Sequence, residues 1–65
     1  MKYDVFVKES GNTWEHEIEC NNKADALLYG NTKLTGEHWA IFEAKNAGKM
    51  VFESNPLDRI EAERR

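Results

Sequence analysis

The sequence predicts an α+β domain in which a four-stranded antiparallel sheet carries one helix on one face. Residues 2–10 and 13–20 alternate apolar and polar side chains with the period of two that is typical of half-buried strands. Residues 21–37 instead carry apolar side chains at helical spacing, and residues 38–53 form a second pair of strands. The element order is therefore β-β-α-β-β, and the strand order 2-1-3-4 keeps every neighbouring pair antiparallel.

The length of 65 residues limits the chain to one domain, which we place at residues 1–54. Residues 55–65 are expected to form a tail or a short helix that starts at Asn55-Pro56. Domains of this size are marginally stable and often rely on a disulfide, a metal ion or a partner. Cys20 is the only cysteine, which rules out an intrachain disulfide and argues against a thiolate zinc site. A partner surface is therefore the expected source of additional stability.

The charge and hydropathy of the chain argue against several classes of protein. No apolar run is long enough to cross a bilayer and no segment resembles a signal peptide, so we expect a cytoplasmic protein without membrane contact. Twelve acidic and nine basic residues give a net charge of −3. This balance lacks the basic surface that supplies most of the affinity for nucleic acid phosphates.

The first two strands form a hairpin around Gly11, which supplies the positive φ of a tight turn. Val5 and Val7 share one face of the first strand, and Phe6 falls on the other. Alternation places four side chains of the second strand on the same face as Val5 and Val7. They are Trp14, His16, Ile18 and Cys20. The opposite face of that strand carries three carboxylates, Glu15, Glu17 and Glu19.

Asn22 is the expected N-cap of the helix, since Asp25 three residues later completes an approximate capping box. Gly36 is suited to the C-terminal cap. Gly30 lies inside the helix, where it costs about 1 kcal/mol relative to alanine, and close packing against the sheet would explain it. The apolar stripe that is expected to face the sheet comprises Ala24, Leu27, Leu28, Asn31 and Leu34.

The second hairpin is apolar at both odd and even positions. A loop at residues 46–48 with Gly48 in the left-handed region would pair Lys45 with Lys49. The uniformly apolar face that results is expected to lie under the helix and comprises Ala40, Phe42, Ala44, Met50 and Phe52. The mixed face is expected to be open, and it presents Trp39, Ile41 and Val51 beside Phe6 of the first strand.

We expect this open face to bind another protein, because interface hot spots combine an aromatic anchor with a charged rim. The predicted partner-binding residues are Phe6, Trp39, Ile41 and Val51 as apolar anchors and Glu15, Glu17 and Glu19 as groups that orient against a basic patch. A homodimer formed through the same face or an edge strand is a variant of this hypothesis. Replacing Trp39 with alanine is then expected to abolish binding without changing thermal unfolding.

Catalysis is not expected, because the sequence shows no nucleophile with its base and no phosphate-binding glycine loop. His16, His38 and Cys20 have no metal-ligand spacing, so no metal and no cofactor are expected. The alternative function is binding of single-stranded nucleic acid, with Phe6 and Trp39 stacking on bases. The glutamates expected on the same face would repel a phosphate backbone, which favours a protein partner.

Three features between Tyr3 and Glu43 carry a resemblance to a known family: the hairpin VFVKESGNTWEHEIEC, the helical segment ADALLYG and the short strand after it. In this order they resemble the small phage-encoded proteins that modulate a host protein, such as an RNA polymerase inhibitor of a lytic coliphage. The resemblance implies a phage or mobile-element origin and binding to a host protein. The fourth strand and the arginine-rich tail depart from that pattern, so the partner's identity is not implied.

Overall fold

The computed structural model describes residues 1–9 and 11–56. Its elements are β1 (Tyr3–Lys8), β2 (Glu15–Cys20), α1 (Lys23–Lys33), β3 (His38–Glu43) and β4 (Asn46–Ser54). The four strands form one antiparallel sheet in the order β2-β1-β3-β4. The predicted ββαββ arrangement and strand order are therefore confirmed. The tail predicted from residue 55 onwards lies outside the described residues after Pro56.

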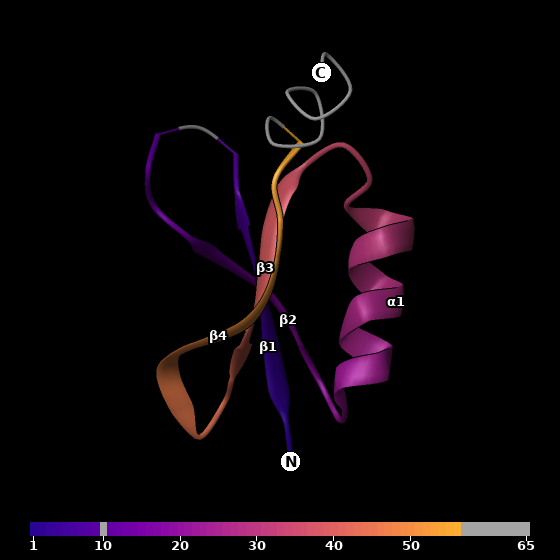
Figure 1. Ribbon diagram of the computed structural model, residues 1–65, viewed down its shortest axis with the longest axis vertical. Helices are drawn as coiled ribbons and strands as arrows, with labels where there is room; N and C mark the ends of the chain where they lie inside the picture. The colour runs from indigo at the N-terminus through magenta and orange to yellow at the C-terminus, as the bar shows by residue number, and fades with distance from the viewer. Residues whose placement is uncertain (10, 57–65) are drawn as a thin grey trace, which may run out of the picture.

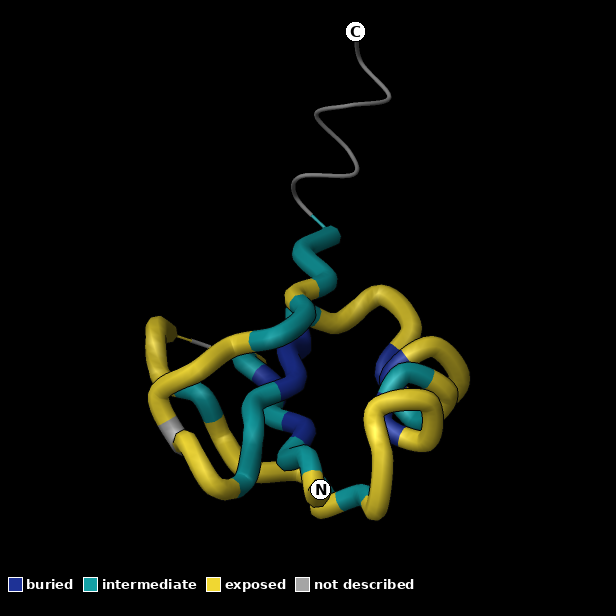
Figure 2. Tube along the Cα trace, turned by 60° about the horizontal axis from the view of Figure 1, so that its bottom comes forward, coloured by how far each residue is buried: buried dark blue, intermediate teal, exposed yellow. Residues whose placement is uncertain are grey.

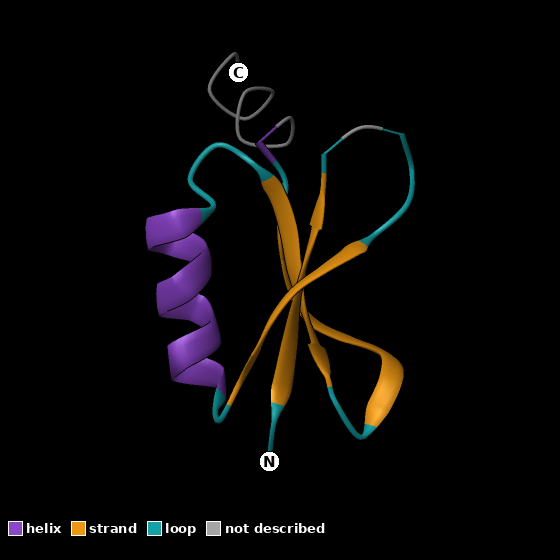
Figure 3. Ribbon diagram, turned by 180° about the vertical axis from the view of Figure 1, so that it is seen from behind, coloured by secondary structure: helices purple, strands orange, loops and turns teal. Residues whose placement is uncertain are grey.

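The sheet is strongly twisted, and α1 lies along one side of it (Figure 1). Seen from behind, the loop between β1 and β2 and the hairpin between β3 and β4 lie at opposite ends and both on the side away from α1 (Figure 3). We call the sheet face that is turned away from α1 the outer face. Within the described part of the chain, no helix has the length and apolar character that crossing a membrane requires.

The sequence around α1 satisfies both ends of the helix. The Asn22 side-chain oxygen accepts a hydrogen bond of 2.8 Å from the backbone N–H of Asp25, and the Asn22 amide donates to the Asp25 carboxylate at 3.2 Å. At the other end, the N–H of Leu34 donates to the carbonyl of Gly30, and Gly36 has φ of +85°. The predicted N-cap is confirmed, whereas the C-cap is Leu34 and Gly36, the predicted cap, lies two residues beyond it.

The core lies between α1 and the two central strands, where the buried segments of helix and sheet face each other (Figure 2). The helix contributes Ala26 and Gly30, with Leu27 partly buried, and its C-cap residue Leu34 is buried as well. The predicted stripe is therefore only partly right, because Ala24 is exposed and Leu28 is 63% exposed. The helix is rotated so that its smallest residues, Ala26 and Gly30, meet the sheet.

Small helical residues are needed there because a bulky side chain of β3 fills the space. Trp39 is only 2% exposed, and a Cβ built on Gly30 would overlap its indole ring. Trp39 lies beside Val7, and Ile41 lies beside Val5, and these four side chains are the buried part of the sheet's contribution to the core. The expectation that close packing explains Gly30 is confirmed.

The face predicted for Trp39 and Ile41 is consequently wrong. Both side chains lie under α1 rather than on an open surface, with Ile41 fully buried. Val51 is also misplaced, because it is half-buried and packs against the same core. Phe6, the fourth predicted anchor, does lie on the outer face, opposite Ala40 of β3.

Both faces of β3 are apolar, and the predicted pairing of β3 with β4 wrongly made the face of Phe42 look like the one that the helix covers. Ile41 pairs with Phe52, whereas the predicted loop paired Phe42 with Phe52, and a shift of one residue moves a strand's side chains to the opposite face. The hairpin turns at residues 44–45 rather than at 46–48. Gly48 lies within β4 without positive φ, whereas Gly11 has the expected φ of +78°.

A second irregularity lies between β1 and β2. Val5 pairs with Ile18, but the next residue, Phe6, pairs with His16, which leaves Glu17 as an extra residue in β2. Ile18 packs against the core as predicted. His16 and Trp14 lie on the outer face instead of the predicted core face, because the bulge reverses the alternation before Ile18.

We expect Gly30→Ala to destabilise the domain. The gain in helix propensity is about 1 kcal/mol, whereas forcing a methyl group into a packed contact costs about 1–3 kcal/mol and more where the neighbour is a buried ring. Urea unfolding of the variant measures the difference. Leu28→Ala on the exposed side of α1 is the control and should change the free energy of unfolding by less than about 0.5 kcal/mol. Equal stability of Gly30→Ala and wild type would contradict the contact.

Trp39→Ala should prevent stable folding. Truncating a buried tryptophan costs about 3–5 kcal/mol, which is comparable to the whole stability expected of so small a domain. Trp14→Ala, on the outer face, is the matched variant and should lose less, because Trp14 is only half-buried. Circular dichroism and thermal melts compare the two. If Trp39→Ala folded and Trp14→Ala did not, the assignment of Trp39 to the core and of Trp14 to the outer face would be contradicted.

Candidate functional site

The outer face of the sheet carries a group of rings that we call the outer aromatic cluster. It consists of Phe6, Trp14, His16, His38 and Phe42. The ring of Phe6 meets those of His16 and Phe42 edge to face, with centroids 5.2 and 5.1 Å apart. Trp14 meets His38 and Phe42 in the same way, at 4.9 and 6.0 Å. Edge-to-face contacts at these distances are the favourable arrangement for aromatic pairs.

Backbone pairing explains why these rings gather. Phe6 of β1 lies between His16 of β2 and Ala40 of β3, and one step along the sheet Lys8 lies beside His38. Ala40 is fully buried although it points away from α1, which means that the cluster covers it. The sheet is therefore packed on both sides. One layer is α1, and the other is the outer aromatic cluster.

Each imidazole of the cluster is held by a carboxylate on the neighbouring strand. Nε2 of His16 lies 3.0 Å from a carboxylate oxygen of Asp4, and Nε2 of His38 lies 2.7 Å from one of Glu53. A carboxylate only accepts, so each Nε2 carries the hydrogen of its bond. The first pair links β2 to β1 and the second links β3 to β4. Both edge strands are thus tied to the central strands through this face.

The lysines Lys2, Lys8 and Lys49 differ in their partners. Lys2 pairs with Glu19 at 3.4 Å, and Lys49 is 3.9 Å from Glu43. Nζ of Lys8 instead lies 4.4 Å from the centroid of the Trp14 ring, a cation–π contact.

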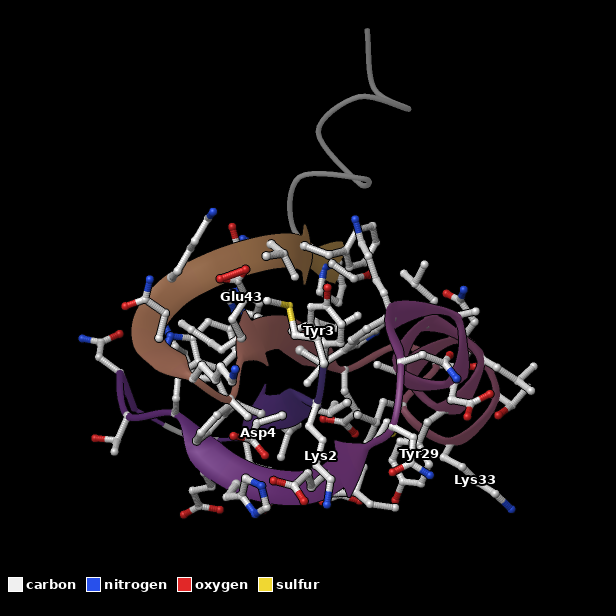
Figure 4. All side chains as sticks on the ribbon, turned by 90° about the horizontal axis from the view of Figure 1, so that it is seen from below. Lys2, Tyr3, Asp4, Tyr29, Lys33 and Glu43 are labelled. Atoms are coloured by element: carbon white, nitrogen blue, oxygen red, sulfur yellow. The ribbon has the colours of Figure 1, made fainter. Side chains whose placement is uncertain are left out.

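The three predicted glutamates do not form a row. Glu19 pairs with Lys2, and the exposed Glu15 lies opposite Val7. Glu17 is the bulge residue, and it accepts a hydrogen bond of 2.6 Å from the hydroxyl of Tyr29. Tyr29 points from α1 towards β2, whereas Lys2 and Asp4 extend from β1 (Figure 4). The glutamates therefore face different surroundings and cannot act as one surface.

Sequence reasoning missed most members of the cluster: of its five residues, only Phe6 was placed on this face. His16 and Trp14 were misplaced by the bulge, and Phe42 by the register of β3 with β4. A signal was present in Gly30, because a glycine that allows close packing implies a large opposite side chain. Trp39 is the largest candidate on β3.

The ionisable groups near α1 do not point to a reactive thiol. Burial, with the nearby charges of Asp25 and Asp4, raises the pKa of Cys20, which disfavours the thiolate. Within residues 1–9 and 11–56, no group of three or more histidine, cysteine, aspartate or glutamate side chains is arranged to hold a metal ion. In the same part of the chain, neither imidazole hydrogen-bonds a hydroxyl or a thiol.

Comparison of the chain with protein-family models, with curated proteins and with solved structures gave no match. The outer face is therefore interpreted from its own geometry.

The Tyr29–Glu17 contact predicts a change in titration. Donation to Glu17 favours the protonated phenol and raises the Tyr29 pKa above the usual 10.0. Because the pKa is raised by folding, the contact stabilises the domain below the unfolded pKa, and this stabilisation is lost as the pH rises through the folded value. Glu17→Ala should therefore lower the Tyr29 midpoint in an ultraviolet titration of tyrosinate.

Glu15→Ala is the control for that titration, since Glu15 lies on the same strand, is exposed and does not accept from Tyr29. Tyr29→Phe identifies which of the two tyrosine transitions belongs to Tyr29. An equal shift in Glu15→Ala and Glu17→Ala would mean that general charge, not the hydrogen bond, raises the pKa.

Proposed function

We propose that the chain is a non-catalytic binding module that docks on a protein partner through the outer face of its sheet. The observation that carries this proposal is the outer aromatic cluster, which places three large aromatic side chains on the face opposite the helix. Aromatic residues and methionine are enriched in protein interfaces and supply most hot spots. The chain acts by occupying a surface of its partner.

Exposure on this face supports the proposal. The rings of Phe6, Trp14 and Phe42 are half-buried, so part of each remains accessible, and His16 is exposed. Met50, which pairs with Phe42 at the edge of the cluster, is 40% exposed. A half-exposed, rigid aromatic surface loses little conformational entropy when a partner covers it.

The charges around the cluster favour protein over nucleic acid. Lys2 and Lys49 are already paired with carboxylates, and Asp4 and Glu53 lie at the cluster itself. Nucleic acid binding requires cations that are free to replace the counterions of phosphates. The alternative of base stacking on these rings is therefore less well supported than docking of a protein.

The setting of this activity is also part of the proposal. Cys20 is a free, half-buried thiol, which suits a reducing cytoplasm. The resemblance to phage-encoded modulators implies that the partner is a host protein and that the cytoplasm is the host's. Modulation by steric occupation requires no group that performs chemistry.

The test uses two exposed apolar residues on opposite sides of the molecule. Met50→Gln changes the outer face, and Leu28→Gln changes the exposed side of α1, where Leu28 is 63% exposed. Tagged variants are used to capture proteins from cell extract, with mass spectrometry to identify them. A protein bound by wild type should be retained by Leu28→Gln and depleted about tenfold by Met50→Gln, the loss expected for an interface residue worth about 1.4 kcal/mol.

Retention by Met50→Gln with loss by Leu28→Gln would move the interface to α1. Sedimentation of the purified chain distinguishes self-association: a dimer that Met50→Gln dissociates would identify a second copy as the partner. Capture that is abolished by nuclease treatment and by moderate salt would instead favour nucleic acid.

A further inference from the structure

One ring of the outer aromatic cluster already binds a cation. Nζ of Lys8 lies over the Trp14 ring at 4.4 Å from its centroid. In the described part of the chain, Lys8 forms no ion pair, whereas Lys2 and Lys49 each have a carboxylate. Tryptophan is the aromatic side chain that attracts cations most strongly. The chain thus fills this ring face with its own flexible side chain.

The surroundings of Lys8 favour positive charge. A hollow of about 460 Å³ extends from the cluster to the turn after α1, and among the described residues that line it Lys8 is the only lysine or arginine. Glu9 and Glu37, both exposed, also line the hollow, as does His38, whose partner is Glu53. Within the described residues, these two carboxylates form no ion pair, and they line the same hollow as Lys8 in a chain of net charge −3.

A planar guanidinium suits this place better than an ammonium group. Arginine stacks on aromatic faces and presents several donors that can reach carboxylates at the same time. Lysine is more strongly hydrated and acts as a point charge. Displacing Lys8 costs little, because a cation–π contact at a partly exposed site is weak and the lysine stem is flexible.

We infer that the outer face receives an arginine side chain of its protein partner, which takes the place of Lys8 over Trp14, beside the hollow that Lys8 lines together with Glu9 and Glu37. This inference rests on the proposed function, since it names the chemistry of the partner at the same face. Lys8 acts as an internal competitor that covers the ring in the free protein.

The competition gives a test that a purely structural role of Trp14 would not pass. The probes are short, end-capped and otherwise uncharged peptides with one central arginine, lysine or citrulline, the last being the uncharged analogue of arginine. Binding is followed by fluorine NMR of protein labelled with fluorotryptophan, in which Trp14→Phe identifies the Trp14 signal beside that of Trp39. The arginine peptide should shift the Trp14 signal saturably and leave the Trp39 signal in place, and the citrulline peptide should bind much more weakly.

Lys8→Gln should bind the arginine peptide about two- to fivefold more tightly than wild type, because the competing cation–π contact is absent. Lys49→Gln is the matched control. It removes the same charge from a lysine on the third-to-fourth-strand hairpin that pairs with Glu43 instead of Trp14. Equal tightening in both variants would reduce the effect to net charge and overturn the inference, as would equal binding of arginine and citrulline peptides.

The outcomes also separate this inference from the proposed function. If Met50→Gln abolishes capture of a partner but no arginine peptide moves the Trp14 signal, docking through the outer face is supported and the inferred arginine contact is contradicted. If Met50→Gln captures the partner as well as wild type does, docking through the outer face fails. A single-stranded oligonucleotide that shifts the Trp14 signal more strongly than the arginine peptide would assign the ring to base stacking and overturn both.

Discussion

The indole of Trp39 lies against the backbone of α1 at Gly30, where no side chain separates helix from sheet. This contact sets how closely α1 approaches β3, and it also fixes which side chains of β3 face the helix. Since Trp39 points to α1, Val7, which pairs with it on β1, must point the same way. Ile41, two residues further along β3, must do so as well. The outer face is then defined as the remainder: Phe6, Ala40 and Phe42.

The elements could be predicted because each has a local cause. Asn22 caps the helix, Gly11 turns the first hairpin, and antiparallel neighbours with one crossover leave the order 2-1-3-4. The orientation of β3 has no local cause. One face of β3 carries Trp39 and Ile41, and the other carries Ala40 and Phe42. Because both faces are apolar, alternation alone cannot predict which of them lies under α1. A bulge at Glu17 and another at Val51 each reverse the alternation, and neither is marked by glycine or proline.

The apolar character of both faces of β3 has a structural explanation. One helix covers only one side of the sheet, and the chain covers part of the other side with Trp14, which is carried back onto the sheet by the end of the β1–β2 loop. Ala40 is small enough to lie fully buried beneath the rings. Within the described residues, the sheet thereby gains a second, thinner apolar layer on the face that α1 does not cover.

This second layer connects stability to binding. The carboxylates that hold His16 and His38 belong to β1 and β4, so the residues that shape the outer face also tie the edge strands to the centre. Removing a ring or an imidazole would therefore disturb the sheet as well as any interface. Met50 and Lys8 differ, because the first is an edge residue with 40% exposure and the second touches the cluster only through a flexible stem. Substitutions at these two positions therefore separate binding from folding, and a change in affinity that they cause can be assigned to the outer face.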